Sequence, residues 1–445
     1  MASLTAFPDR IVVEKKGGFL EAALPSAVGI DVHAEILVCA HQWFDFESHQ
    51  CKHEFKEFGC SQSQRREFAE WVASKHAPVI IMESTGVLWR APYEALEDAG
   101  VPQSTLLLVN ARDVKGKRGH KTDRQDALNL AKQARMGPID GSFVPPRDFR
   151  NMRITSRAYI RSKQDLAREK NRYQKALNSL GSRAGSVFSD VNGKCASAII
   201  DALVNDPDHF EAVVKSKAKR LRHSAEEIMD ALVPVVDEPM RRLLRMLRAR
   251  VSETEKQCEA LFDLLRDEQT AYQKQIDRLM TIPHMKEVSA RLILAEIGPD
   301  LSAFTSIERF SSWAGVCPGV KESAKKAKKG VPVLQGNRWL RFALIELANG
   351  IALTRDGNFL HRIFQKFRER TNRGKAIFAL AHKIIRIIYT LFKNNEDYEE
   401  CTDDGLQMAR ARRLARAAKQ ASLSHLAVED RAVYDTITGE IKAVA

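Results

Sequence analysis

Four acidic side chains occupy positions from which carboxylates could bind a metal ion. Asp31 lies inside the apolar run GIDVH, where burying an acid is costly unless it binds a cation or several donors. Glu83 follows the apolar run PVIIM, at what we expect to be the carboxyl edge of a sheet. Asp123 and Asp126 are three residues apart and share one face of a predicted helix. Oxygen ligands of this kind favour Mg²⁺ or Mn²⁺, and two such ions can support phosphoryl transfer.

The two helix acids also have a simpler interpretation. Thr122 and Gln125 fit a capping-box-like helix start, which would make Asp123 and Asp126 ordinary first-turn acids favoured by the helix dipole. For that pair alone this interpretation is the better one. Asp31 in its strand is harder to explain without a cation, so the combination of all four favours a metal site.

A serine lies in a loop rich in glycine and lysine, AGVCPGVKESAKKAKKG. A serine hydroxyl is a poor nucleophile unless a group removes its proton or stabilises charge on the atom it attacks. From the loop alone, a basic surface loop is the better interpretation of Ser323 and its surroundings. The cations that could hold a phosphate there are Lys325, Lys326, Lys328, Lys329, Arg338 and Arg341.

The positive charge of the chain is concentrated in two windows. The 445 residues include 70 Lys and Arg against 57 Asp and Glu, a net charge of +13. Residues 146–180 hold ten basic and three acidic residues, and residues 315–345 hold seven basic and one acidic, so these windows carry +7 and +6. Such a distribution indicates a protein that binds a polyanion at defined places.

The first window reads as one long helix over residues 147–180 with a basic face. A solvated helix surface usually intermixes both signs of charge, whereas Asp165 and Glu169 lie off this stripe in the sequence pattern. We therefore favour a helix that follows phosphates over a merely solvated surface. Its cations recur mostly at three- or four-residue steps and are Arg150, Arg153, Arg157, Arg161, Arg168, Arg172 and Lys175.

The elements that must position the four acids belong to an α/β domain. Residues 26–58 contain three strand-like runs with tight connections, which predict an antiparallel meander. Helical and strand-like patterns alternate after it, and a helix is predicted from Thr122 to about Arg135. This order predicts an α/β domain with a mixed sheet, followed by all-α structure.

We expect five segments along the chain. They are an extension (1–25), the α/β domain (26–145), a basic-helix and coiled-coil region (146–275), a helical serine-bearing domain (276–395) and a tail (396–445). An apolar seam with a 3.5-residue period in the third segment predicts either a coiled coil and self-association, as a dimer or tetramer, or a helical hairpin inside one chain. The seam is formed by Met240, Leu244, Leu247, Val251, Thr254, Cys258, Leu261 and Leu265.

Composition excludes several classes of protein. The chain is 44% hydrophobic, has no apolar run long enough to span a bilayer, and begins without the apolar stretch of a signal peptide. Its seven cysteines are odd in number and scattered, which argues against a disulfide framework. We expect a soluble protein of the reducing cytoplasm.

The ordered motifs resemble one family. GIDVH around Asp31, ESTG around Glu83 and KTDRQDA with Asp123 and Asp126 are followed by SSWAGVCPGVKES and GNRWLR. This set resembles the bridge-RNA-guided insertion-sequence transposases with a D-E-D-D site, which also include the Piv DNA invertases. The resemblance extends over most of residues 26–390, and its specificity lies in the order of motifs that are individually weak.

The resemblance implies a fold, an activity and partners. It implies an RNase H-like, RuvC-type domain in which Asp31, Glu83, Asp123 and Asp126 bind Mg²⁺ or Mn²⁺. It also implies that Ser323 attacks a DNA phosphate and forms a covalent protein–DNA intermediate. Ala324 stands where the family often has glycine. Donor and target DNA would be chosen by a structured guide RNA, for which the helix 147–180 is the candidate binding face.

The resemblance also places a helix-hairpin-helix element at IPHMKEVSARLILAEIG. His284 and Lys286 stand in the stretch where such a hairpin usually has glycines, which weakens the expected phosphate contact there. Two other functions remain open on the sequence. A RuvC-like DNA junction nuclease would need the four acids and no serine, and an inactive nucleic-acid-binding relic would need only the fold.

Overall fold

The computed structural model describes most of the chain and divides it into two compact units. One unit consists of residues 1–270 and 295–306, and the other of residues 271–294 and 307–445. No helix among the described residues is long and apolar enough to cross a membrane. The residues described are 11–12, 22–83, 86–110, 122–137, 139, 141–232, 237–317, 322–323, 326–327, 336–354, 357–400, 426–429, 432–435 and 441–444.

The first unit contains a mixed five-stranded sheet in the order β5-β4-β3-β6-β7. Its first three strands form the predicted antiparallel meander, and β6 and β7 run parallel to β3. A separate pair of two-residue strands, β1 (Ile11–Val12) and β2 (Ala22–Ala23), is antiparallel. The strands of the main sheet are β3 (Ser26–Val32), β4 (Ile36–Asp45), β5 (Gln50–Gly59), β6 (Ile80–Glu83) and β7 (Leu106–Val109).

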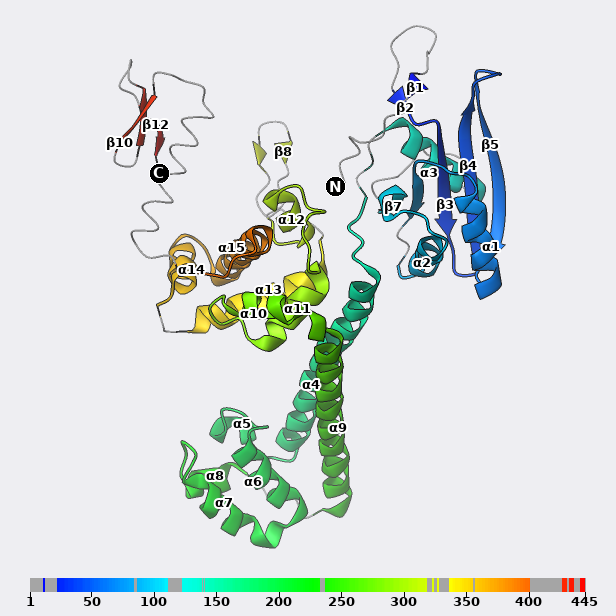
Figure 1. The fold of residues 1–445 in the computed structure, drawn as a ribbon. Coiled ribbons are helices and arrows are strands. Elements are labelled where there is room, and N and C mark those ends of the chain that lie inside the picture. Colours follow the sequence, from blue (N-terminus) through cyan, green and yellow to red (C-terminus); the bar gives the residue numbers. More distant parts are fainter. Residues whose placement is uncertain are drawn as a thin grey trace. The chain divides into compact units, whose positions relative to one another are not determined.

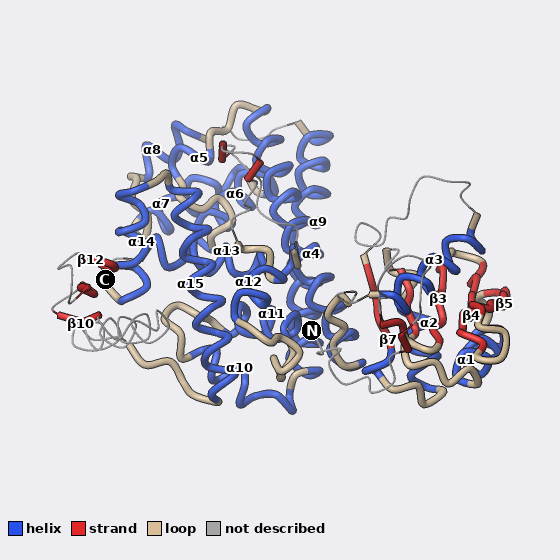
Figure 2. Tube along the Cα trace, turned by 90° about the horizontal axis from the view of Figure 1, so that it is seen from above, coloured by secondary structure: helices blue, strands red, loops and turns tan. Residues whose placement is uncertain are grey.

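Helices cover both faces of this sheet (Figures 1 and 2). Side chains alternate along a strand, so Val28 and Ile30 pack toward α1 (Gln62–Ala73) and α2 (Arg90–Asp98). The opposite face, with Ala27 and Ile81, packs against α3 (Asp123–Met136). A short 3₁₀ helix, Gln103–Thr105, precedes β7. The prediction of an α/β domain with a mixed sheet is therefore confirmed.

Two long helices, α4 (Arg147–Ser179) and α9 (Glu238–Glu268), pack against each other as a hairpin (Figure 1). Cys258 Sγ of the seam lies 3.2 Å from Ser162 Oγ of α4, and the rings of Tyr159 and Phe262 are 5.6 Å apart. The seam is used inside one chain, which is the second of the two alternatives, and self-association stays a prediction. Between the two helices lie α5 (Ala184–Val187), α6 (Lys194–Asn205), a 3₁₀ turn (Pro207–His209), α7 (Phe210–Ala218) and α8 (Ala225–Ala231).

The second unit is helical, as predicted, and α13 and α14 both pack against α15 (Figure 1). The turn between α10 and α11 contains His284 at φ +63°, a left-handed conformation that usually favours glycine. The helices are α10 (Gln273–Met280), α11 (Glu287–Ile297, whose last three residues belong to the first unit), α12 (Ile307–Trp313), α13 (Arg338–Leu353), α14 (Phe359–Arg370) and α15 (Arg373–Asn394), with a 3₁₀ turn (Thr270–Tyr272) before α10.

The tail contains three short antiparallel strands that the sequence pattern did not indicate. They are β10 (Leu426–Glu429), β11 (Ala432–Asp435) and β12 (Ile441–Val444), in sheet order β10-β11-β12. The peripheral helix predicted at ARARRLARAAK (409–419) lies outside the described residues.

Candidate active site

Asp31 and Glu83 come from neighbouring parallel strands at the same edge of the sheet. The register pairs Ile30 of β3 with Met82 of β6, so Asp31 and Glu83 follow as the next residues of each strand. Alternation along the strands places both on the face that α3 covers, because Ala27 and Ile81 pack there. Two acids that are distant in sequence are thus brought to one end of one sheet face.

The backbone of Gly29 allows α3 to lie directly on β3. A Cβ at Gly29 would be 2.1 Å from the Ala127 carbonyl oxygen and 2.6 Å from the Ala131 nitrogen. This contact involves the second and third turns of α3, and the first turn, with Asp123 and Asp126, lies near Asp31, two residues beyond Gly29. A glycine is needed here to permit the close approach of two backbones.

The start of α3 is capped as the sequence suggested. The Thr122 hydroxyl accepts a hydrogen bond from the Gln125 backbone nitrogen at 3.3 Å. The reciprocal half of a capping box is not made by Gln125, whose side-chain amide donates to Asn129 at 2.9 Å. The cap explains where the helix begins, and the acids in its first turn are at the same time directed to the sheet edge.

An imidazole joins the acids. His33 Nε2 lies 3.0 Å from Asp31 Oδ2 and 3.5 Å from Asp123 Oδ1. One potential ligand atom from each of these three residues lies within 4.8 Å of the others, and this is the only such group of three found in the described part of the chain. His33 was not among the residues predicted for the site, although residues two apart on a strand share a face and its spacing from Asp31 could have identified it.

The electrostatics of the cluster favour a bound cation. Burial raises the pKa of Asp31, and the Asp123 and Asp126 carboxylates raise it further, whereas the charge of His33 and its hydrogen bond lower it. The side chain of Asp31 is 12% exposed and that of Asp123 is 59% exposed, so the cluster opens to solvent on the side of α3. A divalent cation placed among these carboxylates would offset their mutual repulsion.

The predicted nucleophile lies on a short hairpin in the second unit. Ser323 ends the two-residue strand β8 (Glu322–Ser323), which pairs antiparallel with β9 (Lys326–Ala327). Lys325, Lys328 and Lys329 lie outside the described residues, as do the side chains of Ser323 and Lys326.

Two glycines bring together the two ends of the segment that carries this hairpin. A Cβ on Gly336 would lie 2.4 Å from the Gly315 nitrogen, and Gly315 has a φ of +71°. The Asn337 nitrogen also donates to the Trp313 carbonyl oxygen at 2.8 Å, and Asn337 caps α13. Of the two predicted cations that follow, Arg338 is exposed with its guanidinium 4.5 Å from the Trp339 ring centroid, and Arg341 is half-buried beside Gly315.

Comparison with protein families decides the identity of the chain. A family model for DEDD transposases of the IS110 type matches residues 28–181, which contain the acid cluster. A second model, for transposases of the IS116/IS110/IS902 family, matches residues 276–362, which contain the serine hairpin. Together the two matches cover more than half of the chain.

The chain belongs to the IS110-type transposases. A transposase is an enzyme that acts on DNA, and the DEDD type suggests dependence on a divalent metal ion, which the acidic cluster described above fits. A search of curated protein sequences found no match.

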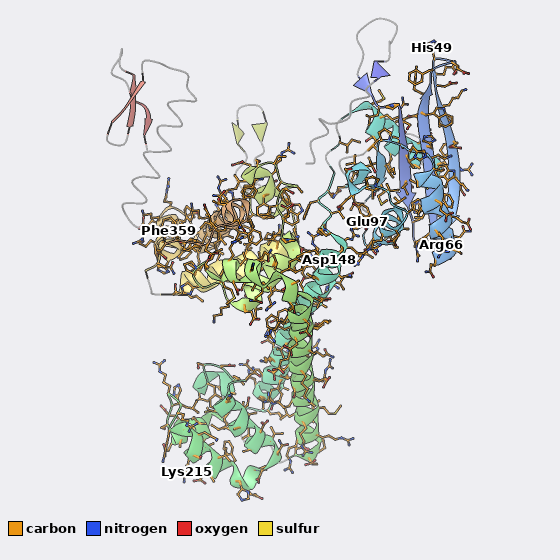
Figure 3. All side chains as sticks on the ribbon, in the orientation of Figure 1. His49, Arg66, Glu97, Asp148, Lys215 and Phe359 are labelled. Carbon is orange, nitrogen blue, oxygen red and sulfur yellow. The ribbon has the colours of Figure 1, made fainter. Side chains whose placement is uncertain are left out.

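The basic face of α4 in this transposase is only partly available to nucleic acid. Arg150 is 3% exposed, and its guanidinium binds two carboxylates of α2, at 3.2 Å from Glu94 and 3.1 Å from Glu97. Figure 3 labels Glu97 on α2, next to the start of α4. The prediction of Arg150 as a nucleic-acid contact is therefore wrong, because its charge is buried and already neutralised.

Two further arginines of α4 bind one buried glutamate. Arg157 makes two hydrogen bonds to the Glu296 carboxylate, at 2.8 and 2.9 Å, and Arg153 Nε lies 3.4 Å from the same group. Glu296 is 1% exposed. Burial lowers the pKa of Arg153, and the negative charge of Glu296 opposes that shift. Arg153 and Arg157 thus also serve the fold.

The predicted cations in the C-terminal half of α4 are exposed to solvent. Arg161, Arg168, Arg172 and Lys175 are all exposed. The expectation that the acids lie off this stripe is wrong, because Arg168 pairs with Asp165 and Arg172 with Glu169, each one helical turn away. A nucleic acid on this face would have to compete with those two carboxylates.

Proposed function

We propose that this transposase is a metal-dependent DNA recombinase that uses the D-E-D-D acids and a serine nucleophile and is directed by a guide RNA. The observation that carries the proposal is the convergence of Asp31 with Asp123 and Asp126, with Glu83 on the adjacent strand. Nothing in ordinary folding favours gathering carboxylates in this way, because their mutual repulsion destabilises the folded state.

The sheet supports an RNase H-like, RuvC-type fold for the first domain. In chain order the strands are arranged third, second, first, fourth and fifth, and the second strand alone, β4, runs opposite to the rest. This arrangement agrees with the fold that the family resemblance implies. The acids at one end of its central parallel strands are then in the usual place for a site in such a sheet.

The carboxylates of Asp31, Glu83, Asp123 and Asp126 would hold Mg²⁺ or Mn²⁺, because hard oxygen ligands suit both ions. When bound, such ions activate a nucleophile and stabilise negative charge on the phosphate and the leaving oxygen. His33 has a positioning role in this proposal, since its imidazole contacts both Asp31 and Asp123 and fixes their separation.

Ser323 would attack a phosphorus atom of the DNA backbone. A bond forms between its oxygen and phosphorus as the bond from phosphorus to one DNA oxygen breaks. The serine proton passes to a base, and the released DNA oxygen takes up a proton. The bond between serine and DNA is itself a phosphodiester, so the free energy of the broken DNA bond is conserved in it. Attack of a DNA hydroxyl on this intermediate releases the serine and can join a different strand. Lysines and arginines around the serine hairpin would hold the phosphate.

The exposed half of α4 is the proposed guide-RNA surface. Arg161, Arg168, Arg172 and Lys175 lie along one helix and are exposed, and A-form duplexes are recognised through backbone and shape. Assembly as a homo-oligomer, dimer or tetramer, is part of the same proposal.

A pair of substitutions separates the proposed function from its alternatives. Ser323→Ala should abolish strand cleavage and any denaturation-resistant protein–DNA adduct, whereas Ser48→Ala, at an exposed turn, should change neither. Asp31→Asn should remove metal binding, measured by calorimetry, together with cleavage. A Ser323→Ala protein that still cleaves strands would identify a RuvC-like junction nuclease instead. Wild-type protein that neither cleaves DNA nor binds Mg²⁺ or Mn²⁺ would be an inactive relic.

The guide RNA has its own test. The protein is purified after co-expression with the DNA that flanks its gene, and the bound RNA is sequenced. We expect one structured RNA encoded by that DNA. Recovery of no specific RNA would remove the guided part of the proposal and leave the recombinase part in place.

A further inference from the structure

A third basic region lies in the second unit, at the turn that joins α14 to α15. Residues 358–376 contain six Lys and Arg and one acid, Glu369, a net charge of +5. The two larger windows already account for the whole net charge of the chain. The +5 of this third region is therefore cancelled by acidic residues elsewhere, and the net charge of the chain does not reveal it. Its cations are Arg362, Lys366, Arg368, Arg370, Arg373 and Lys375.

All six cations are exposed, and none has an ion pair in the described part of the chain. On α14, Arg362, Lys366 and Arg370 recur at four-residue steps, on the side away from the buried Leu360 and Phe364. Most of the arginines of α4 that the structure describes pair with carboxylates. The cations of α4 and those near the α14–α15 turn thus differ in whether they have carboxylate partners, although both sets are positively charged.

The ends of the two helices concentrate these charges. The connection from α14 to α15 is two residues long, and α14 packs against α15, so Arg368 and Arg370 lie close in the chain to Arg373 and Lys375 (Figure 1). The first turn of α15 contains no acid, although the helix dipole favours acids there. Placing Arg373 and Lys375 in that turn disfavours folding slightly, so folding does not explain them.

The chemistry of the surface fits the backbone of duplex DNA. Stacking on single strands needs exposed aromatic side chains, but Phe364 is buried and Phe359 and Phe367 are half-buried. Phe359, labelled in Figure 3, marks the start of α14. Exposed guanidinium and ammonium groups without aromatic neighbours bind phosphates and do not read bases.

We infer that the α14–α15 turn binds the phosphate backbone of duplex DNA. The inference uses the membership of the chain among DNA transposases and does not depend on the serine, the metal or a guide RNA. It assigns to the second unit a DNA contact that does not involve the serine hairpin.

The test is the salt dependence of DNA binding by the full-length protein. A fluorescent duplex of random sequence is titrated in EDTA, so that no metal chemistry contributes, between about 50 and 200 mM salt. Log affinity falls linearly with log salt concentration, and each phosphate contact increases the steepness of that fall, the absolute slope, by about 0.9. The triple variant Arg368→Ala, Arg370→Ala, Arg373→Ala should lower that slope by about 2 to 3 and weaken binding at low salt by about 10- to 100-fold.

The control removes three cations that already have carboxylate partners. Lys52, Lys215 and Arg245 pair with Asp45, Glu211 and Glu238, and Lys52→Ala, Lys215→Ala, Arg245→Ala changes the net charge equally. Its slope should change by less than about 1. The corresponding triple Arg→Lys variant of the α14–α15 turn should keep the wild-type slope, because phosphate contact needs charge more than geometry.

Three results would overturn the inference. In the first, the α14–α15 variant and the control have equal slopes. In the second, the Arg→Lys variant loses as much slope as the Ala variant. In the third, the slope falls with duplex RNA and not with duplex DNA, which would assign the surface to RNA. Failure of strand cleavage in the wild type would count against the proposed function and leave this measurement unaffected.

Discussion

Opposite charges are balanced in the N-terminal half of α4, whereas negative charge is in excess at the edge of the sheet where β3 and β6 end. Arg150, Arg153 and Arg157 are matched by Glu94, Glu97 and Glu296, and their contacts connect α4 to its neighbours. At the edge, Asp31, Asp123 and Asp126 lie close together, and Asp31 Oδ2 has His33 Nε2 as a hydrogen-bonding neighbour at 3.0 Å. Balanced charge stabilises a fold, whereas unbalanced charge disfavours it and indicates a ligand.

The largest effect should come from the buried glutamate of the balanced region. Glu296→Ala would leave Arg153 and Arg157 without their shared partner, and breaking such a buried pair costs about 4 kcal/mol. Glu238 is a matched control, since it also pairs with two arginines but its side chain is 58% exposed. Glu238→Ala should cost less than about 1 kcal/mol. Urea unfolding measures both, and equal losses would contradict the comparison.

Arg150→Ala should destabilise the protein somewhat less, by about 3 kcal/mol, because Glu94 and Glu97 are partly exposed and regain water. Arg147 pairs with the same helix but is 44% exposed, so Arg147→Ala should cost less than about 1 kcal/mol. The slope of DNA affinity against salt should be unchanged in Arg150→Ala. A lower slope in this variant would return Arg150 to the nucleic-acid surface.

Gly29→Ala should affect stability and the metal site together. The new methyl group would collide with the backbone of Ala127 and force α3 away from β3, at a cost of about 1 to 3 kcal/mol. Asp123 and Asp126 move with α3, so Mn²⁺ affinity measured by calorimetry should fall. Gly350→Ala, in α13 with open space around it, should leave metal affinity unchanged and stabilise its helix slightly. Normal Mn²⁺ affinity in Gly29→Ala would show that α3 does not set the site.

Asp31→Asn should have the smallest effect on stability, and of opposite sign. The raised pKa of Asp31 means that the folded state holds its proton more tightly. Below about pH 3.9, the pKa of an aspartate in the unfolded chain, the difference in pKa does not change the free energy of unfolding, because the Asp31 carboxyl is protonated in both states. As pH rises through that value and then through the folded pKa, wild-type stability falls, and the full loss remains at neutral pH. Asp31→Asn should therefore raise the melting temperature of metal-free protein by a few degrees.

The same measurement at two conditions sharpens this prediction. Near pH 3 the two proteins should melt at similar temperatures, because the carboxyl is then protonated in both states. Adding Mn²⁺ at neutral pH should stabilise the wild type and leave Asp31→Asn unchanged. A variant that melts lower than the wild type at neutral pH without metal would mean that Asp31 is not a source of repulsion.

The elements could be predicted from the sequence because their signals are local. The meander, the cap at Thr122 and the long helix after Pro146 all appear as predicted. The partners of the α4 arginines could not be predicted, since Glu97 is 53 residues from Arg150 and Glu296 is 139 residues from Arg157. Helix α14 gives only a weak local signal, because Leu360 and Phe364 are the only buried residues in its short pattern.

The candidate site divides in the same way. Asp31 and Glu83 could be chosen from residue type and position, since an acid in an apolar strand or at a strand end is conspicuous. Asp123 and Asp126 could be chosen only in combination with them, because acids in the first turn of a helix are common. His33 was not predicted, although its position two residues from Asp31 places both side chains on the same face of the chain. The role of Gly29 depends on where α3 crosses β3, and no local pattern contains that information.

Residue type and local pattern are enough to identify which residues can carry chemistry and which helix or strand holds each one. Which of these residues meet depends on tertiary contacts, namely the parallel register of β3 with β6 and the contact of α3 with Gly29. Tertiary contacts also neutralise some arginines of α4 inside the protein and leave the cations of the α14–α15 turn without a carboxylate partner among the residues that the structure describes. The reason is that backbone propensities act over a few residues, whereas the pairing of charges depends on contacts between residues far apart in the chain.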